Sequence, residues 1–413
     1  MPSNAVVVGG GLVGLSCALS LQQSGIRTTL VDPAATPRPA SWGNAGHLAT
    51  EQAEPLASSK TLRSFPRRLF WRGGALSLPA RDLSVWLPFA LRFIRSSTPA
   101  RFTAGRAALG SLLRTAIPAW QRLAKAAHVE HLIAEDGHFV VWESPAGAAA
   151  GRAAWTHTDK GTTTFRDATQ EEIAALSAQI SAPIAGAIRF HGTGQILDPG
   201  ELADGLGEAL VRSGGSKRIA HVRKLVTKGS TAAAMLDGGE LLHADLLVIA
   251  GGVESAALLQ PFGYRVPIIA ERGYHIQAAN TDWPLGLPPV VFEERSMIVT
   301  RFRSGLRAAS FVEFGRAHSP ADPRKWARLR SHVCELGLHF HEPCSEWIGA
   351  RPTLPDYLPA VGRSRRIGNL LYAFGHQHLG LTLAAVSGEL IASLARGEAT
   401  DIDITPFDLE RFL

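Results

Sequence analysis

The strongest constraint on the fold is a glycine-rich turn close to the start of the chain. Val6–Val8 predicts a short buried strand, and Gly9, Gly11 and Gly14 follow it with the spacing G-x-G-x-x-G. The first glycine of this pattern permits a tight turn, the second lets a pyrophosphate approach the backbone, and the third lets a helix pack closely on the strand. The spacing therefore favours a nucleotide-binding turn, with an ordinary glycine turn as the alternative.

The residues around this turn complete a strand–helix–strand unit. Leu12 and Val13 open a helix whose free N–H groups and positive dipole end would face the phosphates. Arg27–Val31 predicts the second strand, and Asp32 ends it where a carboxylate accepts hydrogen bonds from a ribose hydroxyl. Because strand, turn, helix and acid agree, we predict that the chain binds an adenine dinucleotide.

Composition limits the class of protein. The chain has 413 residues, of which 46% are hydrophobic and 19% charged, enough for two domains. Its three cysteines form no C-x-x-C pair, which favours a reducing, cytoplasmic compartment. The net charge of +6 indicates only a general attraction to anionic surfaces, and we expect no nucleic-acid partner. No apolar run reaches the roughly 18–20 residues of a membrane span, and the N-terminus lacks the basic start of a secretion signal.

The later segments alternate between two kinds of pattern. Ile219–Val226 predicts one strand, and a β-rich region from Val266 to Phe314 predicts an antiparallel meander. From Trp347 the strand, loop and helix pattern of the N-terminal region returns. We therefore predict an α/β fold in which a Rossmann-like nucleotide-binding domain (1–55, 186–262 and 346–413) is interwoven with an α+β substrate-binding domain (56–185 and 263–345) built on an antiparallel sheet.

Motifs along the whole chain carry a family resemblance. Besides the glycine turn they are the loop Ser41–Leu48, Asp198-Pro199, Ala250–Gly252, the segment Gly349-x-Arg-Pro-x-x-Pro-Asp356, and Gly375-His-x-x-x-Gly380. In this order they resemble the D-amino-acid oxidase and dehydrogenase superfamily of flavoproteins, closest to the small-subunit type of bacterial D-amino acid dehydrogenase.

The resemblance implies FAD as the cofactor, held without a covalent bond, because Asn44 stands where some relatives carry the linking histidine. It implies that the helix after Gly375 faces the flavin, where reduced flavin carries negative charge that a helix N-terminus stabilises. An ordinary capped helix, and simple strand packing for the adenine-side Val222, are the alternatives. Beyond the glycine turn and Asp32, the implied FAD contacts are Asn44, Ala45, Gly46, His47, Leu48, Val222, Gly251, Gly375, Gly380, Leu381 and Thr382.

The resemblance also implies residues that meet the substrate. Arg351 matches an arginine that forks onto the substrate carboxylate, and a structural salt bridge is its alternative. Tyr274 lies where relatives place a substrate-facing tyrosine, or it packs within the sheet. His376 and His378 are expected to contact substrate or flavin, or to be structural. We expect no metal site, because the histidines show no spacing such as H-x-x-x-H with a carboxylate partner.

The activity that the resemblance implies is oxidation of a D-amino acid, with hydride transfer from Cα to flavin N5 and formation of an imine. The motifs Trp42–His47 and His376–Leu379 favour D-proline or cis-4-hydroxy-D-proline. A general D-amino acid dehydrogenase, a sarcosine- or glycine-type amine oxidase, and the flavin subunit of a hetero-oligomeric dehydrogenase are the alternatives.

A basic and aromatic cluster suggests where the enzyme works. Four arginines between Arg63 and Arg72 interleave with Phe65, Phe70 and Trp71, and the apolar stretch Leu83–Ile94 follows. Basic residues with neighbouring aromatics favour an anionic membrane surface. We expect peripheral contact with the inner face of the membrane and a quinone or respiratory component as electron acceptor, with a solvated helix face as the alternative.

Overall fold

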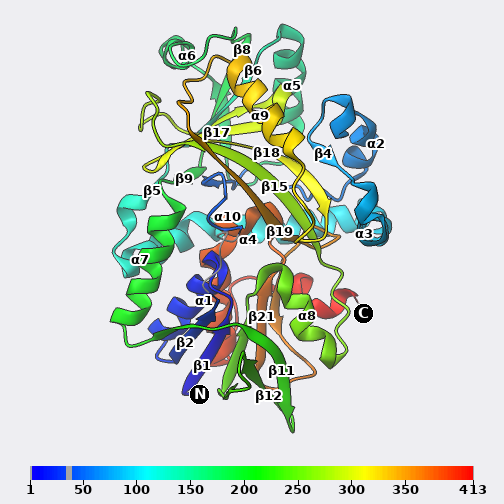
Figure 1. Ribbon diagram of the computed structural model, residues 1–413, viewed down its shortest axis with the longest axis vertical. Coiled ribbons are helices and arrows are strands. Elements are labelled where there is room, and N and C mark those ends of the chain that lie inside the picture. The colour runs from blue at the N-terminus through cyan, green and yellow to red at the C-terminus, as the bar shows by residue number, and fades with distance from the viewer. Residues whose placement is uncertain (1, 34–39, 413) are drawn as a thin grey trace.

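The computed structural model describes residues 2–33 and 40–412, and two large sheets organise them (Figure 1). The lower sheet in Figure 1 has six strands and carries both the N-terminal unit and the C-terminal strands. All neighbours in it are parallel except the last pair, which is antiparallel. Its order is β10 (Ser216–Ile219), β2 (Arg27–Asp32), β1 (Asn4–Val8), β14 (Leu246–Ile249), β21 (Leu370–Phe374) and β20 (Ala360–Arg363).

Helices α1 (Leu12–Gln23) and α10 (Gly380–Arg396) pack together against this sheet, and α4 (Pro99–Ala127) and α7 (Pro199–Arg212) pack around them. Both α1 and α10 are apolar on nearly every face, as buried helices are. By length and hydropathy alone, Gln377–Arg396 could cross a membrane, but 72% of its apolar window is buried within the protein. We therefore interpret α10 as the core helix of this layer.

The upper sheet has nine strands and forms the roof over the first layer (Figure 1). Its middle confirms the predicted meander, because three consecutive strands pair antiparallel there and β15 joins them. Two parallel pairings, β16 with β6 and β4 with β18, make the whole sheet mixed instead of purely antiparallel. The strands are β19 (Cys344–Thr353), β15 (Ile269–Ala278), β18 (Gly305–Gly315), β17 (Met297–Phe302), β16 (Val290–Phe292), β6 (His138–Trp142), β8 (Gly186–His191), β7 (Thr164–Asp167) and β4 (Leu76–Ser77).

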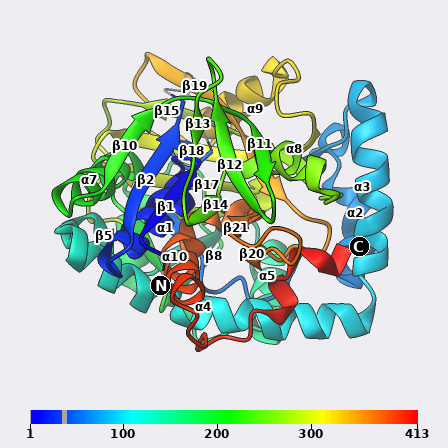
Figure 2. The same cartoon turned by 90° about the horizontal axis from the view of Figure 1, so that it is seen from below.

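Small sheets and helices connect the two layers. One small sheet holds β3 (His47–Leu48), β9 (Gly194–Ile196) and β5 (Ile133–Ala134), and another holds β11 (Val222–Lys228), β12 (Thr231–Leu236) and β13 (Leu241–Leu242). The 29-residue helix α4 runs across the molecule at the level where the two layers meet in Figure 1, and Figure 2 shows it along one side of the molecule. The remaining helices are α2 (Ser59–Arg68), α3 (Leu83–Ser96), α5 (Pro145–His157), α6 (Gln170–Ser177), α8 (Ser255–Leu259) and α9 (Pro323–Glu335).

One predicted strand is wrong. Ile219–Val226 is not continuous, because β10 ends at Ile219 and β11 begins at Val222. The two halves bond to different partners, β10 in parallel with β2 and β11 antiparallel with β12. The strands β8 and β19, which lie at the expected domain limits 186 and 346, pair within the nine-stranded sheet. The division into domains stays a prediction.

Candidate cofactor and substrate site

The glycine turn between β1 and α1 has the shape that a bound dinucleotide requires. Gly9 has φ 111°, and a Cβ placed on it would come within 2.4 Å of the Ala250 carbonyl oxygen. A Cβ on Gly14 would lie 1.8 Å from the Gly9 carbonyl oxygen, so α1 packs as closely as glycine allows. By contrast, a Cβ on Gly11 would approach only the Ser41 hydroxyl, at 3.2 Å. The turn is thus closed on its inner side and open at Gly11, where the pyrophosphate would lie.

The acid that ends β2 lies beside this turn. Asp32 Oδ2 accepts a hydrogen bond of 2.5 Å from the Gly10 N–H. Burial raises the pKa of Asp32 from its usual value, while the Gly10 hydrogen bond and Lys217 oppose that shift. Gly251 follows β14 and borders the turn, because a Cβ on Gly9 would also lie 2.8 Å from the Gly251 nitrogen. These residues, predicted from the sequence, therefore meet at one edge of the parallel sheet.

A second group of predicted FAD contacts comes together where the two layers meet. The loop 44–48 lies against the start of α10, and the Ala49 N–H donates to Thr382 Oγ1 at 3.0 Å. Asn44 Oδ1 accepts from the Gly46 N–H at 2.8 Å, and Gly46 and Gly375 both have positive φ. Ala45 lines the large cavity described below, whereas Leu48, Leu381 and Thr382 are buried. Val222 is buried in a hydrophobic cluster with Val31. This position agrees with an adenine-side contact and equally with simple strand packing.

A cavity of about 940 Å³ lies under the nine-stranded sheet and contains the predicted carboxylate anchor. Arg351 on β19 stands directly opposite Glu271 on β15, and its Nη1 lies 3.3 Å from Glu271 Oε1. Glu271 is buried and also accepts hydrogen bonds from the hydroxyls of Thr353 and Tyr357, each at 3.1 Å. Arg351 is 26% exposed in its side chain, so its guanidinium is both oriented by Glu271 and open to the cavity.

His378 also lines this cavity, with its Nε2 2.5 Å from Gln52 Oε1. Burial lowers the pKa of His378, which favours a neutral imidazole. Tyr357, a cavity residue that sequence reasoning missed, has a pKa held well above its usual value by burial and by Glu271. The sequence indicates this tyrosine only weakly, because it directly follows the Arg-Pro-x-x-Pro-Asp motif and is not part of it.

Two of the expected substrate contacts, Tyr274 and His376, do not line the cavity. His376 is buried, and its Nε2 lies 2.8 Å from Ser387 Oγ on α10. Tyr274 donates its hydroxyl to Glu313 and accepts from the Asp322 N–H, both at 3.1 Å. These contacts correspond to the structural alternatives for both residues, because each side chain is turned into the protein.

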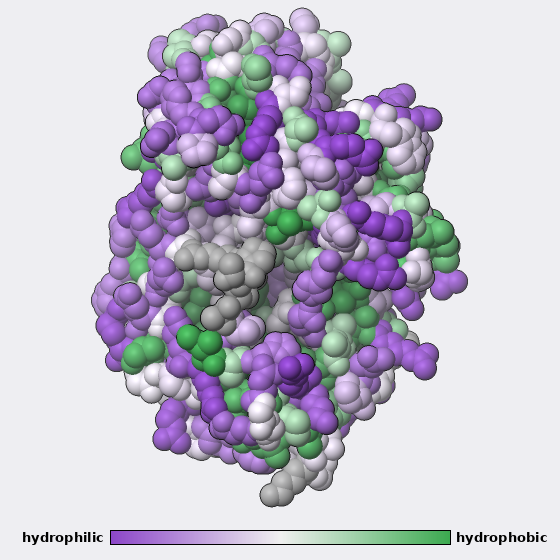
Figure 3. All heavy atoms as spheres, viewed as in Figure 1, coloured by the Kyte–Doolittle hydropathy of each residue, from purple (hydrophilic) through white to green (hydrophobic). Residues whose placement is uncertain are grey.

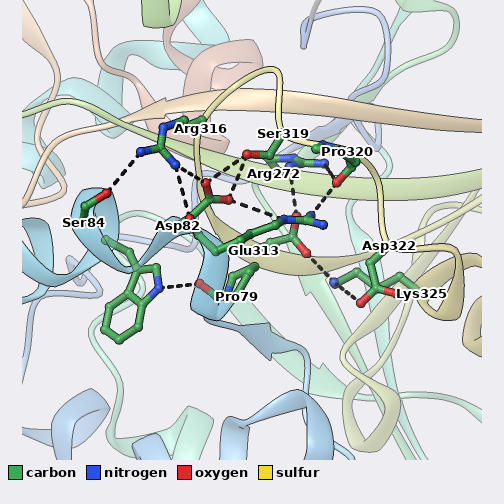
Figure 4. Close-up of polar contacts among 12 residues, drawn as sticks. Pro79, Asp82, Ser84, Arg272, Glu313, Arg316, Ser319, Pro320, Asp322 and Lys325 are labelled. Carbon is green, nitrogen blue, oxygen red and sulfur yellow. Dashed lines mark hydrogen bonds and ion pairs between the residues drawn. The ribbon is translucent and has the colours of Figure 1, made fainter.

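Tyr274 belongs to a network of buried charged residues. Figure 4 shows this network, although Tyr274 itself is not drawn. Glu313 lies 3.2 Å from Arg272 Nη1 and also pairs with Lys325, while Asp82 accepts from Arg316 at 2.8 Å. The network ties α9 and the start of α3 to strands β15 and β18. It therefore stabilises strands β15 and β18 on the face of the nine-stranded sheet that points away from the cavity.

If Tyr274 is structural, Tyr274→Phe should leave kcat/KM within about twofold of the wild-type value. Loss of its hydroxyl removes one donor from buried Glu313 and should cost about 1–2 kcal/mol of unfolding free energy. Urea unfolding and steady-state kinetics on the same preparation measure both quantities. A large fall in kcat/KM with unchanged stability would return Tyr274 to the substrate site.

Three further cavity residues that the sequence did not group are His47, Glu51 and His138. His47 Nε2 lies 3.0 Å from Glu51 Oε1, and the His47 and His138 rings meet edge to face at 4.4 Å. Burial lowers the pKa of His138 to about 3. Burial alone would raise the pKa of Glu51, but the charges of His47 and His138 lower it to about 2.

The parallel sheet, the open glycine turn and Asp32 define a dinucleotide-binding protein. Its cavity contains Arg351 and lies beside the loop 44–48. Residues 4–394 match the model of the DAO family, described as FAD dependent oxidoreductase, and the chain belongs to this family. The resemblance, the fold class and FAD as the cofactor are thereby confirmed, and the protein is an FAD-dependent oxidoreductase.

Similar proteins cover the whole chain. A D-amino-acid oxidase of Bradyrhizobium diazoefficiens is 28% identical over 99% of both chains, and a D-amino acid dehydrogenase 2 of Pseudomonas aeruginosa is 28% identical over 98% of both. Among solved structures, glycine oxidase from Geobacillus kaustophilus superposes with a TM-score of 0.72 at 19% identity, covering 100% of this chain and 99% of that one. L-proline dehydrogenase from P. horikoshii gives 0.71 at 15% identity, with 99% and 97% covered. The solved structures support the fold.

Proposed function

We propose that this enzyme oxidises a D-amino acid at its Cα–N bond. The observation that carries the proposal is the position of Arg351. Buried Glu271 orients its guanidinium, which is open to the cavity beside the loop 44–48. A planar guanidinium binds a carboxylate through two parallel hydrogen bonds and so fixes the direction of the substrate Cα–H bond. The names of the full-length relatives, D-amino-acid oxidase and D-amino acid dehydrogenase, support the same substrate class.

The protein's part in this reaction is to position the substrate. Arg351 binds the carboxylate, and Glu271 keeps the guanidinium plane fixed through its contact with Nη1. When bound, FAD supplies the acceptor for the hydride that leaves Cα. The amine must enter as the neutral base, because its lone pair then forms the C=N bond of an iminium ion as the hydride departs, and loss of a proton to solvent gives the imine. A primary imine is hydrolysed by water to a 2-oxo acid and ammonia, whereas a cyclic substrate keeps its imine.

We further propose a cyclic substrate, D-proline or cis-4-hydroxy-D-proline. The cavity walls are mainly apolar, which suits a pyrrolidine ring, and the His378–Gln52 pair offers polar atoms to a ring hydroxyl. A site that hydrogen-bonds a substrate hydroxyl discriminates against analogues that lack it, because its polar groups are left unpaired. A general D-amino acid dehydrogenase or a sarcosine- or glycine-type oxidase remains the competing function.

His378→Leu tests this assignment through the ratio of kcat/KM for cis-4-hydroxy-D-proline to kcat/KM for D-proline. The change should lower kcat/KM for cis-4-hydroxy-D-proline by about 1–2 kcal/mol, or roughly 5- to 30-fold, more than for D-proline. His376→Leu, outside the cavity, is the control and should change both substrates equally. Equal losses on both substrates for His378→Leu would contradict a role in reading the ring hydroxyl.

We also propose that the electron acceptor is a membrane quinone and that α3 contacts the inner face of the membrane. One face of α3 exposes Leu83, Leu87, Leu91 and Ile94, each between 44% and 54%. This spacing puts all four on one side of a helix. In Figure 3 hydrophobic residues gather at the right margin, where α3 lies, next to hydrophilic ones.

Basic and aromatic side chains border this apolar face. Trp71 is 72% exposed, and Arg67, Arg72, Arg92 and Arg95 are exposed on α2, α3 and the turn between them. Each basic residue near an anionic leaflet contributes about 1 kcal/mol. The cavity itself is lined by residues of α2 and α3, including Ile94, which links the apolar face to the interior. This path suits a lipophilic acceptor that arrives from a bilayer.

Sedimentation with vesicles rich in anionic lipid tests the membrane contact. Wild-type enzyme should sediment at low salt, and the double variant Leu87→Ser/Leu91→Ser should lose at least tenfold in partitioning. Leu285→Ser, which removes an equally exposed leucine elsewhere, should have no effect. Absence of vesicle binding together with strong hydrogen peroxide formation in air would favour a soluble oxidase. Turnover of the purified chain with an artificial dye would exclude the need for a partner subunit.

A further inference from the structure

A cluster of two imidazoles and one carboxylate is buried in the wall of the cavity. His47 comes from β3, Glu51 from the turn after it, and His138 from β6 of the nine-stranded sheet. One ligand atom from each lies within 4.8 Å of the other two, and all three residues line the cavity. The cluster is separate from the charge pair of Arg351 and Glu271.

The contacts of His47 are one hydrogen-bond donor short. His47 Nε2 lies 3.0 Å from Glu51 Oε1, and its Nδ1 lies 3.3 Å from the Gly194 carbonyl oxygen. Both neighbours are acceptors, but a neutral imidazole has only one N–H. In addition, Glu51 Oε2 is buried without a hydrogen-bond partner among the described residues. Either one further proton on the His47–Glu51 pair or a bound cation would satisfy these oxygens.

The surroundings orient both imidazoles as metal ligands are oriented. Gly194 faces His47 Nδ1, and the Thr193 hydroxyl lies 2.9 Å from His138 Nδ1. Metal-binding histidines almost always donate their second ring N–H to a carbonyl, carboxylate or water, which fixes the ring and its tautomer. Here neighbouring residues of one segment provide a carbonyl and a hydroxyl at the two Nδ1 atoms, so Nε2 of each ring would be the ligand atom, that of His47 beside Glu51.

We propose that His47, Glu51 and His138 bind a divalent metal ion of the zinc class. Zinc–nitrogen and zinc–oxygen bonds of about 2.0–2.2 Å hold tetrahedral donors about 3.3–3.6 Å apart. The ligand atoms of this cluster, which lie within 4.8 Å of one another, would draw together around the ion. Two histidines, one carboxylate and an open fourth position are a ligand set found in catalytic zinc sites. The open position would face the cavity and accept an oxygen ligand, such as water, a hydroxyl or a carboxylate.

Isothermal titration of chelator-treated, FAD-loaded enzyme with Zn²⁺ tests the proposal, with metal content measured by mass spectrometry. The wild-type enzyme should bind one equivalent. Glu51→Gln and His138→Phe should weaken binding by at least 100-fold, and the phenylalanine keeps the ring that stacks on Phe190. Thr193→Val, which removes only the hydroxyl at His138 Nδ1, should weaken it by about 10- to 100-fold.

Two comparisons keep this experiment decisive. His341→Ala disrupts an exposed group with His339 and Asp282 and should leave zinc binding unchanged. Flavin content and the unfolding transition of each variant show whether the protein is folded and loaded. Absence of zinc binding to the wild-type enzyme, or binding that survives both Glu51→Gln and His138→Phe, would overturn the proposal. The cluster would then be a hydrogen-bonded pair of His47 and Glu51.

Discussion

Arg351→Ala is expected to lower kcat/KM by about 30- to 5,000-fold while FAD stays bound. Removal of one partner from a secluded, hydrogen-bonded charge pair costs about 2–5 kcal/mol. The loss should appear mainly as a higher KM, because the guanidinium contacts the carboxylate in both the bound substrate and the transition state. Steady-state kinetics over a wide substrate range, with the flavin content of the same sample, measure the effect.

The alanine variant also leaves Glu271 buried beside an empty position, so a second pair of variants is needed. Arg351→Lys keeps the charge but not the fork, and it should recover only part of the activity. Arg351→Met with Glu271→Gln removes both charges, which should restore stability without restoring substrate affinity. Near-normal turnover of Arg351→Ala at low substrate concentration would mean that another residue binds the carboxylate.

Gly11→Val is expected to abolish FAD binding without preventing folding. A Cβ at this position meets only the Ser41 hydroxyl, at 3.2 Å, so a small shift of that side chain lets the apoprotein accommodate it. The same space is where the pyrophosphate approaches the backbone. The ratio of flavin to protein absorbance after purification measures the loss, and circular dichroism shows whether the fold is retained.

Two other glycines calibrate this experiment. Gly286→Val places a side chain in open space and should keep full flavin content. Gly14→Val should fail to fold, because its Cβ would overlap the Gly9 carbonyl oxygen at 1.8 Å. A yellow, fully loaded Gly11→Val protein would contradict the placement of the cofactor at this turn.

The nucleotide-binding half could be predicted from the sequence because its signals are local. A strand, a turn and a helix within residues 6–32 specify each other through the glycine spacing. The structure shows the close packing at Gly9 and Gly14 and places Asp32 beside the turn. The strand predicted over Ile219–Val226 was wrong for the opposite reason. Its two halves look like one β-segment, and only pairing with β2 and β12 separates them.

The positions of the substrate-site residues depend on the register between paired strands, which the sequence does not reveal. On β15 and β19, Arg351 stands opposite Glu271, whereas Tyr274 stands opposite Ile348. Positions 271 and 274 differ by an odd number, so their side chains lie on opposite faces of the sheet. Tyr274 therefore cannot share the cavity face with Arg351, although the two residues lie on neighbouring strands. The grouping of His138 with His47 likewise needs the pairing of distant segments.

Anaerobic mixing of the purified enzyme with single amino acids tests the central claim most directly, because loss of the visible flavin absorption reports substrate oxidation without any external acceptor. D-proline, cis-4-hydroxy-D-proline and a set of acyclic D-amino acids should be compared with their L-enantiomers, glycine and sarcosine. We predict rapid bleaching by D-amino acids, fastest with a cyclic one, and none by the L-enantiomers. Bleaching only by L-amino acids, glycine or sarcosine, or by none of these compounds, would contradict a D-amino acid oxidising function.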